Sequence, residues 1–401
     1  MHKSAYQTCV NWLFERFPSY QNVGAEAYKP GLERVFELLD ILQIDPKKIP
    51  AIHIAGTNGK GSTAAYCASM LQESGLKMGL FTSPHIFDFS ERIRVNGCPI
   101  TQSYVIDFCT RFQNLNSTIE ASFFELTFAM ALAYFQEQDC DYIVIETGLG
   151  GRLDATNIIN PKVSIITTIG LDHQEFLGNT LEAIAGEKAG IIKAETPVVI
   201  GETSPATRFI FEQQSSVLNA PIYFAENGKQ LTENLPLSGY QATNFKTALM
   251  ALEVIGLDIL PQTQITALEN LQRNTGFFGR LETWQHAPKI ILDVSHNPAG
   301  IAATLPLIEK ECKGQLFILY GASKDKDALE ILESFPKHAH VAACVFRNPR
   351  SKNLSDWQSL GIQTIFEDLP FAISETKNKM QAQDLLWITG SFFLLADLPQ
   401  R

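Results

Sequence analysis

The chain has 401 residues, a length typical of two domains. Hydrophobic residues make up 45% of the sequence and charged residues 19%, which argues against a disordered, collagen-like or coiled-coil protein. The 43 acidic residues outnumber the 32 Lys and Arg, and the formal net charge is −11. Because duplex binding needs a basic surface, we expect no nucleic-acid partner. An anionic ligand must be attracted by local cations, since the net field repels it.

The sequence also argues against membrane and secretory classes. It has no apolar run near the roughly 20 residues that a membrane span needs, and its start lacks the apolar stretch of a secretory signal. The seven cysteines are scattered without a Cys-x-x-Cys pair, as is typical of reduced thiols. We therefore expect a cytoplasmic protein without a zinc site or a membrane partner.

Short β-branched runs alternate with helical stretches, the pattern of parallel α/β layers. In the first part we expect strands at residues 51–55, 77–81, 142–145, 163–169 and 197–200. Helices are expected at residues 62–74, which stop at Gly75 as a C-cap, and at residues 122–138.

A second series of strands follows at residues 289–294, 315–320, 340–346, 363–366 and 385–389. Residues 301–312 and 328–335 have the spacing of helices between them. Gly276, Gly279 and Pro288 interrupt the periodicity near residues 275–287. We therefore predict an α/β protein with one domain over residues 1–278 and a smaller one over residues 279–401.

The most informative segment is residues 52–63, Ile-His-Ile-Ala-Gly-Thr-Asn-Gly-Lys-Gly-Ser-Thr. A strand leads into a glycine-rich turn, then Lys60, then hydroxyls that open a helix. Glycines let backbone N–H groups approach phosphate oxygens, while the helix N-terminus and the lysine add positive potential. The strict P-loop template is broken by Ile54 at its first glycine position and by Gly61 after Lys60. A tight strand–helix turn is the alternative, but the segment favours phosphate binding.

Polar residues follow two further strands. Glu146 ends an apolar strand, at the edge where open α/β sheets bind ligands, and could reach the metal that accompanies nucleotide phosphates. Asp172 and His173 follow the strand at residues 163–169. Oxygen is the ligand that magnesium prefers, which favours Asp172, but the residues alone leave this open. Lys188, taken alone, reads as a solvated helix lysine.

The second part repeats the design of a strand followed by a polar turn. Residues 290–298 read Ile-Ile-Leu-Asp-Val-Ser-His-Asn-Pro, and Gly279-Arg280 lies upstream. Arg280 and His296 are candidate anion contacts, and Asp293 could accept from ribose hydroxyls. A cleft between the two domains is the usual place for such a ligand site.

At this point the residues resemble folylpolyglutamate synthases, members of the Mur ligase superfamily. The resemblance extends in family order over nearly the whole chain and rests on His53 to Ser62, Ser83-Pro84-His85, Glu91 to Val95, Glu146 to Asn157, Asp172-His173, Glu187 to Gly190, Asp293 to Pro298, and Thr389 to Phe392. It implies an N-terminal P-loop-type ATPase domain with a mostly parallel sheet and a smaller Rossmann-like C-terminal glutamate-ligase domain. It also implies an active site between them.

The resemblance implies roles for particular residues. ATP would be held by Thr57, Asn58, Gly59, Lys60, Gly61, Ser62, Asn244, Arg280 and Asp293. Magnesium, at two sites, would be held by Ser83, Glu146 and His173, in place of the oxygen-based choice of Asp172. Lys188 would be carbamylated, and Lys60, Lys188 and His296 would be the catalytic residues. The acceptor would be bound by Asn22, Val23, Gly24, Ala25, Ser122, Phe124, Leu153, Asp154 and Ala155.

The bacterial bifunctional members resemble this chain most. This resemblance implies an ATP-dependent ligase that adds L-glutamate to dihydropteroate and to reduced folates through an acyl phosphate. It also implies that the protein is a monomer. The alternatives are a monofunctional folylpolyglutamate synthase, a Mur-type ligase acting on a cell-wall precursor, a nucleotide-dependent binding module, and a metabolite kinase.

Overall fold

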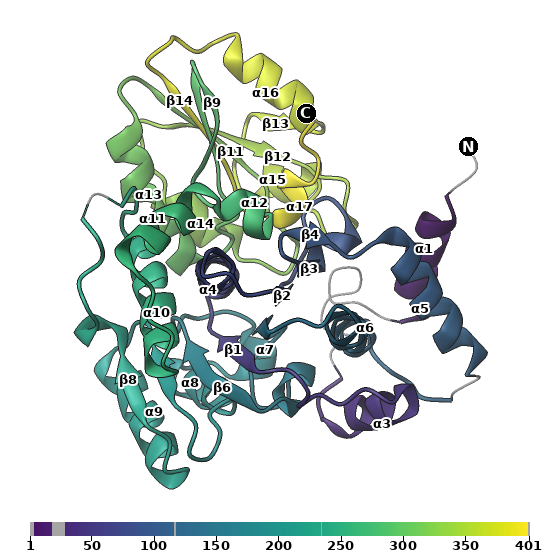
Figure 1. Cartoon of the computed structure of the whole chain (residues 1–401). Coiled ribbons are helices and arrows are strands. Elements are labelled where there is room, and N and C mark those ends of the chain that lie inside the picture. The colour runs from purple at the N-terminus through teal and green to yellow at the C-terminus, as the bar shows by residue number, and fades with distance from the viewer. Residues whose placement is uncertain (1–3, 18–28, 116–117, 234, 400–401) are drawn as a thin grey trace. The chain divides into compact units, whose positions relative to one another are not determined.

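The computed structural model describes residues 4–17, 29–115, 118–233 and 235–399 (Figure 1). The predicted acceptor residues Asn22, Val23, Gly24 and Ala25 lie outside these ranges. The chain divides into two compact units. The first comprises Met1–Leu237 and Gln241–Phe277, and the second comprises Ser238–Tyr240 and Phe278–Arg401.

The first unit contains an eight-stranded sheet in the order β4-β3-β2-β5-β1-β6-β7-β8. Its strands are β1 (Ala51–Ala55), β2 (Met78–Phe81), β3 (Ile93–Val95), β4 (Cys98–Pro99), β5 (Tyr142–Glu146), β6 (Pro161–Ile166), β7 (Val198–Ile200) and β8 (Ile222–Phe224). Strands β2, β5, β1, β6, β7 and β8 are parallel, while at one edge β3 pairs antiparallel with β2 and β4 pairs antiparallel with β3. The central strand β1 therefore delivers its carboxyl end beside those of β5 and β6.

The helices of this unit are α1 (Ala5–Arg16), α3 (Glu33–Leu42), α4 (Lys60–Glu73), α5 (Gln102–Asn114), α6 (Phe123–Glu137), α7 (Gln174–Leu177), α8 (Leu181–Ala189), α9 (Pro205–Val217), α10 (Tyr240–Val254), α11 (Pro261–Glu269) and α12 (Leu271–Thr275). Within the described ranges, short 3₁₀ turns are η2 (Phe89–Arg92), η3 (Ala155–Ile158) and η4 (Ala225–Asn227).

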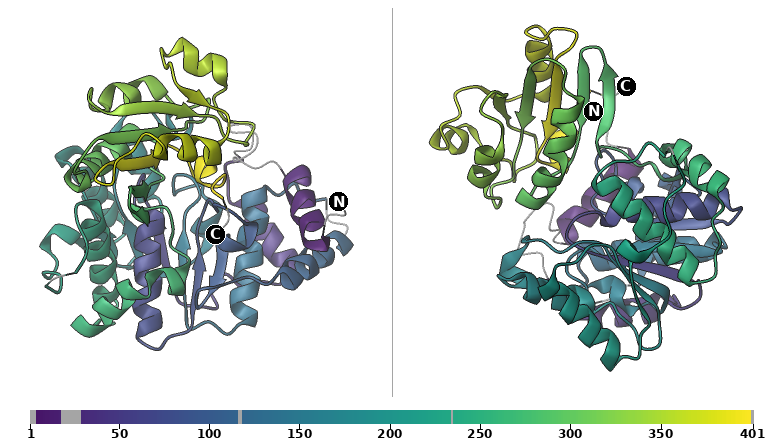
Figure 2. Two further views of the ribbon diagram at one scale, coloured as in Figure 1. Left: turned by 90° about the horizontal axis from the view of Figure 1, so that it is seen from above. Right: turned by 90° about the vertical axis from the view of Figure 1, so that its left-hand side faces the viewer.

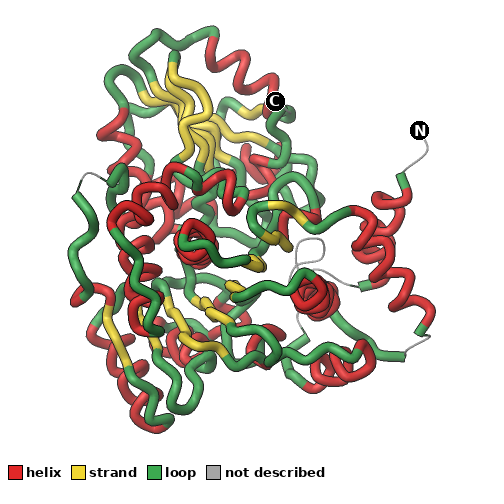
Figure 3. The backbone as a smooth tube through the Cα atoms, viewed as in Figure 1, coloured by secondary structure: helices red, strands yellow, loops and turns green. Residues whose placement is uncertain are grey.

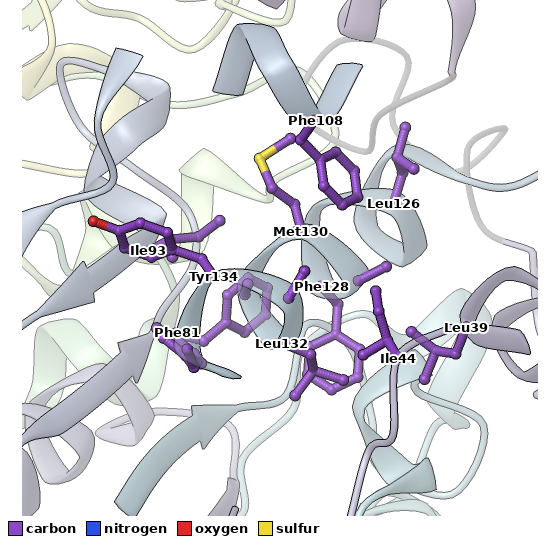
Figure 4. Close-up of a cluster of buried hydrophobic side chains, with 14 of the residues drawn as sticks. Leu39, Ile44, Phe81, Ile93, Phe108, Leu126, Phe128, Met130, Leu132 and Tyr134 are labelled. Carbon is purple, nitrogen blue, oxygen red and sulfur yellow. The ribbon is translucent and has the colours of Figure 1, made fainter. Parts of the chain in front are cut away.

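Alternate residues of β1 face two different cores, as the two-residue period of a strand requires. Ile52 and Ile54 pack with buried residues of α4 and α10. Ala51 packs on the other side with α3, α5 and α6, whose cluster includes Phe81 and Phe128 (Figure 4). Because both faces are covered, β1 is buried throughout.

The second unit contains a six-stranded sheet in the order β13-β12-β11-β14-β10-β9 (Figure 3). Its strands are β9 (Glu282–His286), β10 (Lys289–Leu292), β11 (Leu316–Tyr320), β12 (His340–Cys344), β13 (Ile365–Phe366) and β14 (Leu385–Thr389). Its helices are α13 (Pro298–Glu311), α14 (Ala328–Ser334), α15 (Leu354–Ser359), α16 (Leu369–Lys377) and α17 (Phe392–Leu395). Helices lie along both faces of this mostly parallel sheet (Figure 2).

The predicted α/β class is confirmed, and each predicted strand and helix is present. Several predicted ends were wrong. The strand predicted at 163–169 ends at Ile166, because Thr167 and Thr168 turn to bond with the loop after β1. The strands predicted to reach residues 294 and 346 end at Leu292 and Cys344, and the helix predicted from 301 begins at Pro298.

Candidate active site

The glycine-rich turn connects β1 to α4 and is tied to the end of β6. The N–H of Thr57 donates to the Thr168 carbonyl oxygen at 2.8 Å, and that of Asn58 donates to Thr168 Oγ1 at 3.2 Å. The Thr167 hydroxyl donates to the Asn58 carbonyl oxygen at 2.6 Å. These bonds fix the turn so that α4 presents its first N–H groups at the carboxyl edge of the sheet.

Gly59 is the N-cap of α4 and has a φ of 86°, in the left-handed region. A Cβ at this position would lie 2.5 Å from Asn244 Oδ1, so the turn also needs glycine for space. Asn244, on α10, is buried and lies directly against the predicted phosphate loop.

Two lysines converge on the turn. Lys60 Nζ donates to the carbonyl oxygens of Gly56 and Thr57, at 3.1 and 3.3 Å. Lys188 Nζ donates to the Gly56 carbonyl oxygen at 2.9 Å, although Lys188 is only 3% exposed. Burial, and after it the charge of Lys60, lowers the pKa of Lys188 to about 7, while Asp172 and Asp154 act in the opposite direction. The default prediction that Lys188 is a solvated lysine was wrong.

Glu146 ends β5 beside this turn. Its Oε2 accepts from the Ser83 N–H at 3.0 Å, and a Cβ on Gly61 would lie 3.5 Å from the same oxygen. The carboxylate is 4% exposed. Ser83, Glu146 and the first turn of α4 are therefore brought together, with a carboxylate facing the end of the helix that favours anions.

Asp172 and His173 follow the loop after β6, which Thr57 holds. The Thr57 hydroxyl donates to the Gly170 carbonyl oxygen at 3.1 Å, and the Gly170 N–H donates to Thr57 Oγ1 at 3.0 Å. Asp172 is buried and accepts from the His173 N–H at 2.9 Å. His173 Nε2 lies 3.9 Å from Asp172 Oδ2.

The described residues contain no group of three or more His, Cys, Asp or Glu that could hold a metal by itself. The predicted metal ligands offer a carboxylate, a hydroxyl and an imidazole. Such a set fits a cation that takes the rest of its ligands from phosphate oxygens and water, which is how Mg²⁺ accompanies nucleotides. It does not fit a closed structural site.

The predicted acceptor residues that the structure describes, Ser122, Phe124 and residues 153–155, lie at the start of α6 and in the segment that follows β5. Ser122 is the N-cap of α6, and its hydroxyl accepts from the Glu125 N–H at 3.1 Å. The ring of Phe124 lies against the backbone of Gly148, where a Cβ would be 2.7 Å from the ring. Leu153 is half-buried, and Ala155 is buried at the start of η3.

Asp154 is buried and serves the turn that follows Glu146. Its Oδ2 accepts from the N–H groups of Gly148 and Leu149, at 2.9 and 2.8 Å. Its Oδ1 accepts from the N–H and the hydroxyl of Thr156. Burial raises the pKa of Asp154, while these four hydrogen bonds act against that rise. Both carboxylate oxygens thus hold the turn in place.

In the second unit, predicted residues gather where β10 and β14 end side by side. Asp293 is 1% exposed and accepts from the N–H groups of Leu281 and Ser295, at 2.9 and 2.8 Å, and from the Tyr240 hydroxyl at 3.1 Å. The Arg280 guanidinium lies 4.7 Å from the centre of the Phe392 ring, and the His296 ring lies 6.0 Å from it. Arg280, Asp293 and His296 therefore form one polar cluster within this unit.

Sequence reasoning missed the residues that hold the site. Thr167 and Thr168 were placed inside a strand, and their polarity beside the glycine-rich turn was the available signal. His53 received no role of its own, yet it is fully buried and contacts Thr156 at 2.8 Å. A histidine in an otherwise apolar strand was the signal there.

Among the described residues, every helix is too short or too polar to span a lipid bilayer.

Comparison with known proteins relates both units to Mur ligases. The Mur ligase middle domain matches residues 54–265, and the Mur ligase glutamate ligase domain matches residues 279–392. A dihydrofolate synthase/folylpolyglutamate synthase from Bacillus subtilis is 33% identical over 99% of both chains.

Solved structures agree. Escherichia coli FolC in complex with DHPP and ADP superimposes with a TM-score of 0.86 and 27% identity, covering 98% of this chain and 97% of that one. A bifunctional folylpolyglutamate synthase/dihydrofolate synthase with Mn, AMPPNP and L-glutamate bound gives a TM-score of 0.84 and 27% identity, covering 99% and 98%. The chain therefore belongs to the dihydrofolate synthase/folylpolyglutamate synthase family of Mur ligases.

Proposed function

We propose that this protein is an ATP-dependent ligase that adds L-glutamate to dihydropteroate and to reduced folates in the cytoplasm, acting as a monomer. One observation carries the proposal. A glycine-rich turn, two lysines and a buried carboxylate meet where β1 and β5 end. Such groups bind and transfer a phosphoryl group, and relatives with this fold bind ADP or AMPPNP.

Activation of a carboxylate explains why the reaction needs ATP. An acceptor carboxylate is unreactive toward an amine because oxide is a very poor leaving group. Attack by a carboxylate oxygen on the γ-phosphorus breaks the bond to ADP and forms an acyl phosphate. The glutamate amine then attacks the acyl carbon, phosphate leaves, and the nitrogen loses a proton to give the amide.

The chain's own groups supply position and charge for these steps. The first N–H groups of α4 and the Lys60 ammonium would bind the β- and γ-phosphates, and Asn244 would contact the nucleotide from α10. Ser83, Glu146 and His173 would hold magnesium, and a second magnesium would join it. When bound, the metal neutralises phosphate charge and aligns the oxygens.

Lys188 is suited to carbamylation. Its lowered pKa, about 7, keeps much of the amine neutral at physiological pH, and the neutral amine is the form that attacks CO₂. The product nitrogen keeps one N–H, which can still donate to the Gly56 carbonyl oxygen. The new negative charge would be attracted by Lys60, whose charge opposes protonation of the free amine. We propose that this carbamate is a further oxygen ligand for magnesium.

Phe124, Ser122 and residues 153–155 would bind the pterin-bearing acceptor, together with Asn22, Val23, Gly24 and Ala25. In the second unit, Arg280 and Asp293 would contact the nucleotide, and His296 would contact the transferring phosphate. Their shared cluster at the end of β10 supports a common role. The structure with bound L-glutamate supports the choice of amino acid.

The test is phosphate release from ATP by the purified protein. We expect release only when glutamate and an acceptor are both present, with dihydropteroate and tetrahydrofolate compared side by side. Turnover on tetrahydrofolate alone would identify a monofunctional folylpolyglutamate synthase. Turnover with uridine-diphosphate muropeptides, without an amino acid, or to a stable phosphorylated product would contradict the proposal.

A further inference from the structure

A buried histidine lies behind the acceptor region, and the proposed mechanism does not use it. His53 is in the centre of β1 and is completely buried, on the opposite face of the strand from Ile52 and Ile54. Its Nε2 lies 2.8 Å from Thr156 Oγ1. Its Nδ1 has no hydrogen-bond partner among the described residues.

The hydrogen-bond directions around Thr156 can be assigned from chemistry. The Thr156 hydroxyl contacts Asp154 Oδ1, and an ionised carboxylate can only accept. The hydroxyl proton is therefore donated to Asp154, which leaves the oxygen to accept from His53. His53 must then carry its proton on Nε2, and the unpartnered Nδ1 holds a lone pair. Burial, followed by the charge of Lys193, lowers the pKa of His53 to about 3, which agrees with a neutral ring.

The chain of donors continues to the acceptor region. Asp154 receives the Thr156 hydroxyl on one oxygen and the N–H groups of Gly148 and Leu149 on the other. The backbone of Gly148 in turn supports the ring of Phe124. A hydrogen-bonded path therefore runs from the centre of β1 to the turn after Glu146 and ends at an aromatic side chain proposed to touch the acceptor.

We propose that His53 is a positioning residue, which acts through Thr156 and Asp154 to hold the turn at Gly148 and Leu149 against Phe124. This rests on the proposed function for its meaning in catalysis. Without the His53 donor, the Thr156 hydroxyl can rotate and Asp154 loses one of its four partners. The Phe124 ring then loses the fixed support of the Gly148 backbone, while the glycine-rich turn keeps its own bonds to Thr167 and Thr168.

The experiment compares His53→Leu, which removes the donor, with His53→Gln, which can place an amide N–H near the position of Nε2. Thr156→Val removes the hydroxyl with little change of shape and serves if His53→Leu does not fold. Ser69→Ala is the matched control, because Ser69 is also fully buried and donates to the Ala267 carbonyl oxygen at 2.6 Å, far along α4 from the turn.

We expect His53→Leu and Thr156→Val to raise KM for the acceptor by about tenfold or more, with KM for ATP nearly unchanged. His53→Gln should recover most of the loss. The double variant His53→Leu/Thr156→Val should have an acceptor KM no higher than that of Thr156→Val, because both substitutions act on one hydrogen-bonded path. Ser69→Ala should lower thermal stability without changing KM for the acceptor. An unchanged acceptor KM in both donor-removing variants, or an equal rise in both KM values, would overturn the proposal.

Hydrogen exchange gives a readout that does not need activity. The amides of Gly148 and Leu149 should exchange faster in His53→Leu and Thr156→Val than in the wild type, and at the wild-type rate in Ser69→Ala. Unchanged exchange at these two amides would contradict the positioning role even in an active enzyme. If the wild type lacks ligase activity while the exchange result holds, the proposed function fails and the hydrogen-bonded path stands.

Discussion

Lys60 and Lys188 donate to the same carbonyl oxygen, that of Gly56, at 3.1 and 2.9 Å. Lys60 is the first residue of α4 and Lys188 comes from α8, so the sheet edge brings together two amines that are 128 positions apart in the chain. Two ammonium groups at one acceptor repel, and burial adds to the cost. Lys188 is the more buried of the two, and burial together with the charge of Lys60 lowers the pKa of its amine.

The first prediction concerns activity. Lys188→Met removes the amine but keeps an apolar chain of similar length, and it should lower kcat by about 100-fold or more, because the proposed carbamate is lost. A small carboxylate such as acetate should restore part of the activity. Lys162→Met is the control, since Lys162 is exposed on β6. Full activity in Lys188→Met, measured as phosphate release, would exclude the carbamate.

The second prediction concerns stability against pH. The pKa of Lys188 is about 7 in the folded chain and has its ordinary value of 10.5 in the unfolded chain, so between these values the unfolded chain binds more protons than the folded chain. The Lys188 contribution to the free energy of unfolding therefore rises with pH from about 7 to about 10. Below pH 7 the amine is protonated in both states, so the folded chain carries the full free-energy cost of burying this charge.

Lys188→Met should therefore have a higher Tm than the wild type at pH 7, and the difference should shrink toward pH 10. Urea titrations at several pH values, without CO₂ or ligands, measure how the free energy of unfolding changes with pH. A Tm difference independent of pH, or a variant less stable than the wild type at pH 7, would show that burial does not penalise this amine.

The third prediction separates backbone strain from nucleotide binding. Gly59 and Gly75 have nearly the same φ, 86° and 88°, but only Gly59 has an atom in the way of a Cβ. Both alanine variants should lose about 1 kcal/mol of stability from left-handed strain. Gly59→Ala should also push against Asn244 and weaken ADP binding by about tenfold or more. Calorimetric titration with ADP is the measurement, and equal ADP affinities in the two variants would contradict a phosphate-binding turn at Gly59.

Periodicity was enough to predict the apolar parallel strands, because a strand buried on both faces is a continuous apolar run, as in β1 and β5. It missed β9, whose sequence Glu-Thr-Trp-Gln-His is polar. That segment becomes a strand by pairing antiparallel with β10, a long-range cause that local sequence does not contain. The two-residue strand β4 and the three-residue strands β3 and β8 were too short to have a period.

The candidate site likewise has a part that local sequence predicts and a part that depends on contacts between distant segments. The glycine-rich turn is local in sequence and was identified from its own residues. Lys188 could not be, because its burial depends on neighbours from other segments, such as Gly56. The small and apolar residues around it, Ala185, Ala189 and Ile191, were a usable sign that this helix faces inward. The path through His53 needed atomic distances, since only they assign the donors.

The fourth prediction concerns the metal. In Glu146→Gln the amide carbonyl can still accept from the Ser83 N–H, so the fold should keep nearly its wild-type stability. The lost negative charge should raise the Mg²⁺ concentration for half-maximal activity by about tenfold or more and lower kcat by about 100-fold. Glu73→Gln is the matched control, because Glu73 ends α4, the helix that begins beside Glu146, and is hydrogen-bonded to Asn270 and Asn274. About 20 Å of helix separates the two ends, so Glu73→Gln should leave the Mg²⁺ requirement unchanged. If the two variants respond alike to a Mg²⁺ titration, the metal is not held by Glu146, and the carboxylate has a structural role, as in its bond from Ser83.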